Sequence, residues 1–292
     1  MLYPSFALPL LEVSAEHVRK IYGYCRGLEV RLEDSGLVAL HSDPKCIEYA
    51  KLVVGTWFDP WKHLNEVDEA LRDVVEKLLD AYGWMGIATS PRDDVELFAS
   101  IVLSRNTDYH TNVVRWMRRI LEIGIGRFLE MGSDEVSKIV GRSYQIHQLR
   151  EVLRNYLAIR DKLLQSGSLT VRRAIMEMKF LGPKTADAYL LFVKLDTSYA
   201  PIDRNLQTFV RMLGLENVLG NEVPTKQICL KYLDCDSCPH ESCLLKGLRR
   251  YLGRMSGWFQ TVAYVHAKIF CREKRCYECS LRSLCRARFS QS

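Results

Sequence analysis

One lysine and one aspartate stand where side chains can do covalent chemistry. Lys184 follows Gly182 and Pro183 at the predicted start of a helix, and Asp203 comes nineteen residues later, in a polar break before another predicted helix. A lysine amine can attack an electrophilic carbon and form a Schiff base, and a nearby carboxylate can stabilise the positive charge that develops. The pair therefore indicates nucleophilic catalysis; the alternative for Lys184 is an ordinary surface lysine at a helix start.

Eight of the ten cysteines fall into two groups in the last third of the chain. The group nearer the C-terminus has the spacing Cys-x4-Cys-x2-Cys-x5-Cys and consists of Cys271, Cys276, Cys279 and Cys285. The other group has the spacing Cys-x5-Cys-x2-Cys-x4-Cys and consists of Cys229, Cys235, Cys238 and Cys243. Four clustered thiols usually hold a metal, either as an iron-sulfur cluster or as zinc.

The two groups do not carry the same prediction. For residues 229–243, a second metal site, disulfides and free thiols all remain open. Cys25 and Cys46 stand far from both groups. We expect them to be packing residues, because an isolated cysteine behaves as a small apolar side chain.

The positive charge is concentrated at the C-terminal end of the chain. Residues 244–292 contain eleven Lys or Arg and two acidic residues, whereas the whole chain has a net charge of +6. A basic region of this kind is typical of proteins that bind a polyanion, because neutralising phosphates releases counterions. A solvated charged face is the alternative.

The composition is that of a folded globular protein, with 48% hydrophobic and 26% charged residues. No apolar run approaches the roughly eighteen residues that a membrane helix needs. Residues 1–11 lack the basic start and the cleavage site of a signal peptide. We therefore expect a monomer that makes no membrane contact and is cytoplasmic and nucleoid-associated, or nuclear if the source is eukaryotic.

The elements that must position these residues are mostly helices. Residues 28–32 and 37–40 read as a β-hairpin whose loop, 33–36, contains a glycine. Apolar residues at helical spacing then predict helices over 67–82, 95–103, 112–123, 133–139, 146–164, 171–178, 185–193, 205–213 and 257–270. The expected fold class is mainly α, with a small β-containing N-terminal domain.

Residues 171–193 predict two helices joined by a tight turn, a helix-hairpin-helix. Gly182 lets the backbone approach a phosphate closely, and the start of the following helix supplies amide donors and the positive end of its dipole. Gly182, Pro183 and Thr185 are therefore candidate DNA contacts. Such a hairpin grips DNA without reading its sequence.

Together these segments resemble the catalytic core of the helix-hairpin-helix (HhH-GPD) DNA glycosylases, the superfamily of endonuclease III and 8-oxoguanine DNA glycosylase. The resemblance implies two helical subdomains flanking a DNA cleft, with Lys184 as the nucleophile and Asp203 as the essential carboxylate. Hairpins of this superfamily usually carry two glycines, whereas Phe180 stands at the first position here. We expect the turn to be somewhat wider as a result.

Residues 91–108 resemble the first core helix of the superfamily and the loop that follows it. That loop places a polar side chain in the gap left by a flipped base, which makes Arg105 and Asn106 the candidates here. A plain helix-terminating loop is the alternative reading.

The last cysteine group resembles the iron-sulfur loop of endonuclease III, although its first gap is four residues rather than the usual six. The resemblance implies a 4Fe-4S cluster, with zinc as the competitor. The loop carries Arg272, Lys274 and Arg275, which we expect to face DNA phosphates.

The sequence thus predicts four regions: 1–88, an N-terminal α+β extension; 89–215, the catalytic core; 216–256, a cysteine-containing insertion; and 257–292, the last helix and the cluster loop. The expected activity is excision of a damaged base, with oxidised bases favoured, followed by nicking at the abasic site of double-stranded DNA. A glycosylase without lyase activity and a non-catalytic DNA-binding iron-sulfur module are the alternatives. Oxidised purines, oxidised pyrimidines and alkylated or mismatched bases all remain open as substrates.

Overall fold

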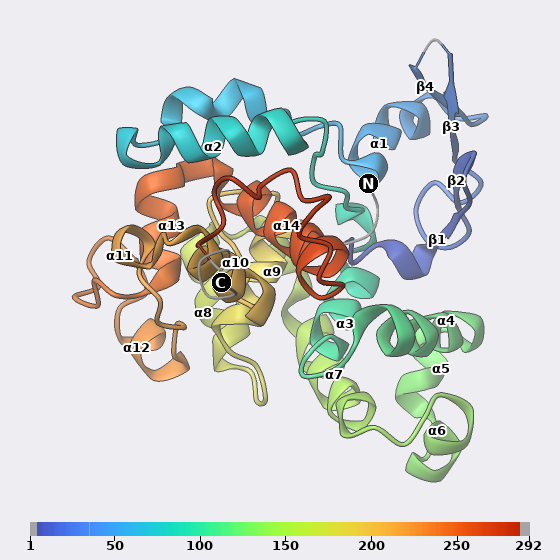
Figure 1. Ribbon diagram of the computed structural model, residues 1–292. Coiled ribbons are helices and arrows are strands. Elements are labelled where there is room, and N and C mark those ends of the chain that lie inside the picture. Colours follow the sequence, from blue (N-terminus) through green and yellow to red (C-terminus); the bar gives the residue numbers. More distant parts are fainter. Residues whose placement is uncertain (1–4, 35, 287–292) are drawn as a thin grey trace.

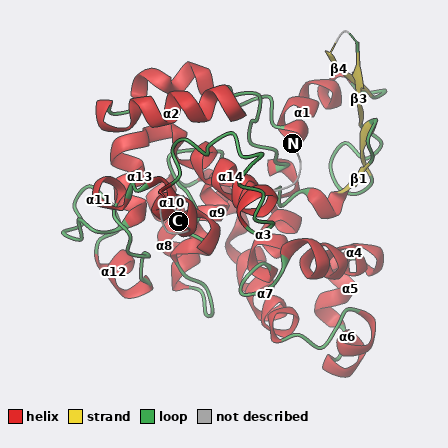
Figure 2. Cartoon of the chain, viewed as in Figure 1, coloured by secondary structure: helices red, strands yellow, loops and turns green. Residues whose placement is uncertain are grey.

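The computed structural model describes residues 5–34 and 36–286, so Ser35 in the predicted hairpin loop lies outside the described residues. Helices make up most of this part of the chain, and the strands lie together at its N-terminal end (Figure 2). The predicted mainly α class with a small N-terminal sheet is therefore confirmed. None of the helices in 5–34 and 36–286 has the length and apolar character needed to cross a membrane.

The sheet is a four-stranded antiparallel meander in the order β1-β2-β3-β4. Its strands are β1 Leu11–Val13, β2 His17–Lys20, β3 Glu29–Glu33 and β4 Gly36–Leu40. The predicted hairpin is formed by β3 and β4, with Val30 opposite Ala39. The strands β1 and β2 were not predicted, because each is too short to carry an alternating pattern of its own.

The helices follow the predicted pattern closely in the body of the protein. They are α1 Pro44–Val54, α2 Glu69–Tyr82, α3 Asp94–Leu103, α4 Val114–Ile123, α5 Ile125–Glu130, α6 Ser133–Ile139, α7 Tyr144–Gln165, α8 Ser168–Glu177, α9 Pro183–Phe192, α10 Arg204–Leu213, α11 Glu216–Leu219, α12 Lys226–Lys231, α13 Leu244–Leu252 and α14 Ser256–His266. Helix α6 begins and ends where the sequence predicts. Helices α1, α5, α11, α12 and α13 were not predicted.

The helices fall into two groups on either side of the molecule. Figure 1 shows α4 to α7 on one side and α8 to α13 on the other, with α14 between them. Helix α3 bridges the groups, because it packs against both α7 and α9. Its Phe98 lies against Tyr156 of α7, with ring centroids 4.3 Å apart, and against Tyr189 of α9 at 5.7 Å.

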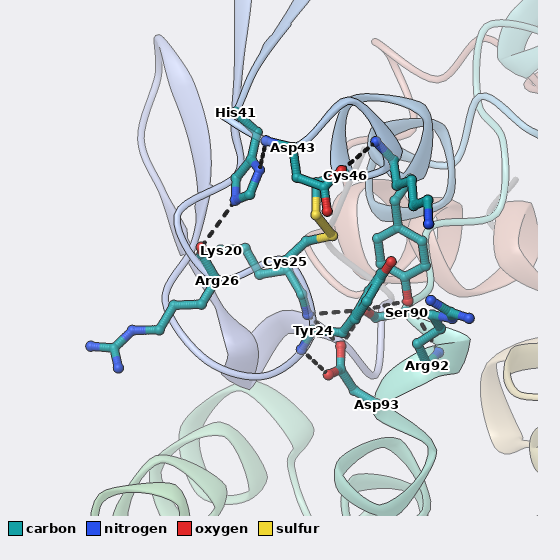
Figure 3. Close-up of a disulfide and its surroundings, with 12 residues drawn as sticks. Lys20, Tyr24, Cys25, Arg26, His41, Asp43, Cys46, Ser90, Arg92 and Asp93 are labelled. Atoms are coloured by element: carbon teal, nitrogen blue, oxygen red, sulfur yellow. Dashed lines mark hydrogen bonds and ion pairs between the residues drawn. A yellow bond between two sulfur atoms is a disulfide. The ribbon is translucent and has the colours of Figure 1, made fainter.

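A buried polar cluster attaches the N-terminal sheet to the start of α3. Lys20 pairs with Asp93 and donates a hydrogen bond to Ser90 Oγ at 3.0 Å. The backbone amide of Tyr24 donates to Asp93 Oδ1 at 2.6 Å. Figure 3 shows these groups beside the sheet. Because a buried carboxylate is costly unless it is paired, the cluster specifies where the sheet sits on the helical body.

The expectation that Cys25 and Cys46 are separate packing residues was wrong, because they form a disulfide (Figure 3). The strands β3 and β4 carry the chain out and back, which brings the two Cα atoms to 5.5 Å across 21 positions of sequence. That distance lies in the ordinary range for a disulfide, and it results from tertiary structure that the sequence spacing does not reveal.

Replacing both cysteines by serine is expected to lower the free energy of unfolding by about 3 kcal/mol, because the bond closes a loop of roughly twenty residues in the unfolded chain. Denaturant unfolding of the wild-type and double-variant proteins would measure the difference. A reducing agent should destabilise the wild type toward the variant and leave the variant unchanged. Equal transition midpoints for the two oxidised proteins would contradict a stabilising disulfide.

Candidate active site

The turn between α8 and α9 adopts a conformation that usually calls for glycine. Phe180 has a φ of 67°, in the left-handed region that bulky residues rarely occupy. Its carbonyl accepts a hydrogen bond from Arg105 NH1 at 2.5 Å. Phe180 thus takes the backbone role that a first hairpin glycine would serve, at the cost of some strain.

Gly182 caps the N-terminus of α9 with an extended backbone, φ −148° and ψ −171°. Its carbonyl accepts hydrogen bonds from the amides of Thr185 and Ala186, both at 3.1 Å, so the first turn of α9 starts there. A Cβ atom at Gly182 would meet nothing within 4 Å. The backbone is therefore open on this side, as close approach by a phosphate requires.

Lys184 is the single residue of α9 that is not buried; the other nine residues of this helix are in the core. The helix cannot rotate or slide without exposing apolar surface, so its burial fixes where the lysine emerges. The exposed side chain of Lys184 lies at the positive end of the helix dipole.

Asp203 caps the N-terminus of α10 and is half-buried. Its Oδ1 accepts a hydrogen bond from the amide of Leu206 at 2.8 Å, and its Oδ2 accepts a longer one from Asn205 Nδ2 at 3.4 Å. Arg272 NH2 donates to Asn205 Oδ1 at 2.8 Å. The cap fixes the carboxylate, and Arg272 links this position to the C-terminal cysteine loop.

Lys184 and Asp203 line one cavity of about 520 Å³. Aromatic rings form part of its wall, from Phe6, Tyr109, Phe192 and Tyr264. Positive side chains outnumber carboxylates around it, because Arg105, Lys184, Arg204, Lys268 and Arg272 face Asp108 and Asp203. A mixed apolar and cationic lining suits a planar base with an attached phosphate.

A second hollow of about 410 Å³ lies beside the first and contains Phe180 and Gly182 of the hairpin. Both hollows are lined by Lys184, Thr185, Arg105 and Asn106. We take the larger cavity as the candidate active site, because it contains both Lys184 and Asp203.

The two candidate gap-filling residues differ in the structure. The guanidinium of Arg105 donates to the carbonyl of Val102 at 2.8 Å and to Gln148 Oε1 at 2.8 Å, in addition to Phe180. Burial lowers the pKa of Arg105. Asn106 is exposed, with a left-handed backbone (φ 52°). Arg105 therefore ties the loop to the hairpin, whereas the side chain of Asn106 is exposed.

The N-terminal segment forms part of the cavity wall, which the sequence did not predict. Phe6 packs edge-to-face on Tyr109 and Phe192, with ring centroids 5.3 and 5.0 Å away. The hydroxyl of Tyr109 donates to the carbonyl of Ser5 at 2.8 Å. No motif near the N-terminus signals this contact, because it depends on a chain separation of 104 residues.

An ion pair between Asp108 and Lys268 also lines the cavity and was not predicted as a pair. Lys268 Nζ lies 3.1 Å from Asp108 Oδ2. Hydrogen bonds from Thr111, together with Lys268, hold the pKa of Asp108 well below its usual range. The pair fixes a second carboxylate in the wall of the cavity that contains Asp203, with its negative charge compensated by Lys268.

The three residues of the C-terminal loop that the sequence predicts to contact DNA, Arg272, Lys274 and Arg275, have different surroundings. Arg272 is bound to Asn205, as described above. Arg275 forms an ion pair with Glu278, and its Nε donates to Glu278 Oε2 at 2.9 Å. Lys274 is exposed. An incoming phosphate would have to compete with Glu278 for Arg275, whereas Lys274 is directly accessible.

The thiols of the C-terminal loop, Cys271, Cys276, Cys279 and Cys285, are all free. The amide of Cys279 donates to the carbonyl of Cys276 at 3.4 Å and closes a turn. Burial, reinforced by the neighbouring thiols, raises the pKa of Cys271 to about 11. Within residues 5–34 and 36–286, no three Cys, His, Asp or Glu side chains are arranged to hold a metal ion. The donor set itself, four thiols on one short loop, fits an iron-sulfur cluster.

His266 connects this loop to the helical body. Its Nδ1 is 2.6 Å from the hydroxyl of Tyr82, and its Nε2 is 3.5 Å from Cys279 Sγ. Burial lowers the pKa of His266 to about 4. His266 is thus a neutral, buried side chain that packs between the helical body and the loop.

No protein-family model matches the chain, and no curated protein sequence matches it. Solved structures do resemble it. The 8-oxoguanine glycosylase/lyase of Clostridium acetobutylicum, in complex with double-stranded DNA, has a TM-score of 0.64 and 12% identity over 88% of this chain and 87% of that chain. MBOgg1, in complex with a low affinity DNA ligand, has a TM-score of 0.60 and 15% identity over 87% and 86%.

The 3-methyladenine DNA glycosylase of Archaeoglobus fulgidus has a TM-score of 0.58 and 14% identity, over 90% of this chain and 91% of that chain. At sequence identities this low, the likeness shows a shared fold and nothing more. The chain has the fold of the helix-hairpin-helix DNA glycosylases, as the sequence predicted.

Proposed function

We propose that this protein is a DNA repair glycosylase that excises a damaged base and then nicks the strand as an AP lyase. The observation that carries the proposal is that Lys184 and Asp203, each at the start of a helix that packs into the core, line one cavity of about 520 Å³. The likeness in fold to DNA glycosylases supports it.

In this proposal the hairpin around Gly182 binds the phosphate backbone, and the target nucleotide leaves the base stack and enters the cavity. The cavity volume lies within the usual range for small-molecule sites, and its aromatic wall offers rings for a base to stack on. Asn106, at the rim, fills the gap in the duplex. Base identity is then set by the wall around Phe6 and Tyr264.

The chemistry uses the two side chains in turn. The Nζ lone pair of Lys184 forms a bond to C1′, while the glycosidic bond breaks and the base leaves with its electron pair and takes up a proton. Opening of the sugar ring gives an iminium between Nζ and C1′. Loss of a C2′ proton then expels the 3′ phosphate. The carboxylate of Asp203 stabilises the positive charge on the sugar in the first step.

Borohydride trapping on abasic DNA and excision from a panel of single-lesion duplexes test the proposal together. We expect a covalent protein–DNA adduct with the abasic duplex and release of at least one damaged base from the panel. Base release without an adduct would indicate a glycosylase that lacks lyase activity. If neither is observed, the chain is a DNA-binding module without this chemistry.

We further propose that Cys271, Cys276, Cys279 and Cys285 hold a 4Fe-4S cluster. Free thiols, their shared loop and the basic residues around them support this assignment. When bound, the cluster would hold its loop in one conformation and would take no part in the reaction. That conformation presents Lys274 to DNA and keeps Arg272 against Asn205 beside the active site.

Anaerobically purified protein is expected to be brown and to contain about four irons in this loop. Cys276→Ser should lose the iron and weaken DNA binding together, because the loop loses its fixed shape. Iron analysis, the visible spectrum and a DNA-binding titration measure the two effects. A colourless protein with zinc in this loop, or a full iron content in Cys276→Ser, would contradict the assignment.

A further inference from the structure

The second cysteine group gathers around a small cavity that is separate from the active site. Cys229, Cys235, Cys238 and Cys243 all line a space of about 50 Å³ next to Arg172 and Lys246. Three of these cysteines are buried and the fourth is half-buried. The four residues are spread over fifteen positions in the chain, and the fold places all of them on the wall of one cavity.

The backbone around this cavity is held in place on several sides. The amide of Cys238 donates to the carbonyl of Cys235 at 3.2 Å, which makes a Cys-x2-Cys turn. Cys243 forms a parallel bridge with Glu222. The amide of Leu244 donates to the carbonyl of Glu222 at 2.9 Å. These contacts hold the backbone on which Cys235, Cys238 and Cys243 lie.

A buried arginine points at one of the sulfurs. Arg172 is fully buried, and its NH2 lies 3.6 Å from Cys229 Sγ. A neutral thiol is a weak acceptor for a charged donor, whereas a thiolate is a strong one. Lys246 Nζ adds a second buried positive charge, donating to the carbonyl of Cys238 at 2.6 Å. Each cation also has a carboxylate partner, Asp187 for Arg172 and Glu241 for Lys246, so donors surround the sulfurs without a large unpaired charge.

We propose that Cys229, Cys235, Cys238 and Cys243 bind one zinc ion as four thiolates. Zinc takes four sulfur ligands in a tetrahedron with Zn–S distances of about 2.3 Å, and a space of about 50 Å³ suits a single ion. The thiol protons leave to solvent on binding. Arg172 donates to Cys229 Sγ and Lys246 to the Cys238 carbonyl, so both groups contact the edge of the site while Asp187 and Glu241 balance their charges.

Disulfides are the competing state for these cysteines. The structure forms a disulfide between Cys25 and Cys46, yet leaves all four thiols of this group unpaired. In the described part of the chain their side chains surround the cavity without yet converging on one point. When the ion binds, rotation about the Cα–Cβ bonds of the cysteines brings their sulfur atoms together and completes the site.

The site contacts both helices of the hairpin through Arg172. Arg172, on α8, donates from Nε to Asp187 Oδ1 of α9 at 2.6 Å while its NH2 faces Cys229. Lys226, at the start of α12, donates to the carbonyl of Met178 in the hairpin turn at 3.1 Å. Zinc would thus hold the segment 226–243 as a support for both hairpin helices.

Elemental analysis of zinc and iron in protein produced with added zinc tests the proposal. We expect one zinc ion per chain beside the iron, and its loss in both Cys238→Ser and Cys243→Ser. Cys25→Ser is the matched control, because it removes a cysteine outside this site and should keep the zinc. Cys276→Ser should also keep the zinc while it loses iron, which separates the two sites.

A measurement on the wild-type protein tests the proposal even if the serine variants fail to fold. Titration of its thiols with a mercurial reagent should release the zinc as four thiols react, and cobalt in its place should give the absorption of tetrahedral thiolate coordination. Unchanged zinc in both serine variants would overturn the proposal. So would iron bound at these cysteines, or thiols that react only after reduction.

Discussion

Replacing Lys184 by Gln is expected to abolish the borohydride-trapped adduct with abasic DNA. The substitution removes the amine that forms the iminium, and α9 is retained because the other nine residues of the helix, all buried, hold it in place. DNA affinity should fall by no more than about fivefold, since one exposed charge contributes roughly 0.2–1 kcal/mol. Gel analysis of the adduct and a binding titration measure the two quantities separately.

Lys179→Gln is the matched control, because it removes an equal charge from the same turn. Lys179 is exposed and pairs with Glu151 outside the cavity, with Nζ and Oε1 3.4 Å apart. Trapping should persist in this variant. An adduct of normal yield in Lys184→Gln would place the nucleophile on another amine and remove the main support for the lyase proposal.

Asp203→Asn is expected to lower the excision rate by about two to three orders of magnitude. One preorganised charge at a cationic transition state is typically worth about 3–4 kcal/mol. Asparagine is as good a helix cap as aspartate, and its side-chain oxygen can keep the hydrogen bond from the Leu206 amide. The loss should therefore appear in single-turnover excision without a fall in thermal stability.

Asp196→Asn provides the comparison, because it removes a negative charge from the segment between α9 and α10 without touching the cavity. Asp196 accepts hydrogen bonds from Ser168 and Ser198, both at 2.6 Å. Excision by this variant should stay within about threefold of wild type. An Asp203→Asn protein that excises at the wild-type rate would remove Asp203 from the proposed chemistry.

Segments with a clear apolar stripe and a clear terminator were the part of the fold that the sequence predicted best. Helices α6, α7 and α10 lie within two residues of their expected bounds, because each has an apolar stripe at helical spacing and a clear terminator. The short helices α11 and α12 lack room for such a pattern. Their positions depend on packing, as at Gly247, where a Cβ atom would lie 2.1 Å from the carbonyl oxygen of Leu219.

The candidate site was predictable where local motifs carry it and not where distant segments meet. Lys184 and Asp203 could be found from a glycine turn, a helix start and their spacing. Phe6 could not, because its place in the cavity wall depends on packing against Tyr109 and Phe192. The prediction that Cys25 and Cys46 are packing residues was wrong for the same reason. The spacing of residues in the sequence does not indicate which distant residues the fold brings together.

Arg105 lies just after the end of α3 yet donates to the carbonyl of Phe180 in the hairpin turn, 75 residues away in the chain. The same guanidinium is bonded to Gln148 of α7 and to the carbonyl of Val102 at the end of α3. Lifting the turn away would break hydrogen bonds that a charged donor shares among three elements. We therefore expect the turn to open together with α3 and α7 as one cooperative unit, so that hydrogen exchange at its amides should reflect sub-global opening rather than local fraying.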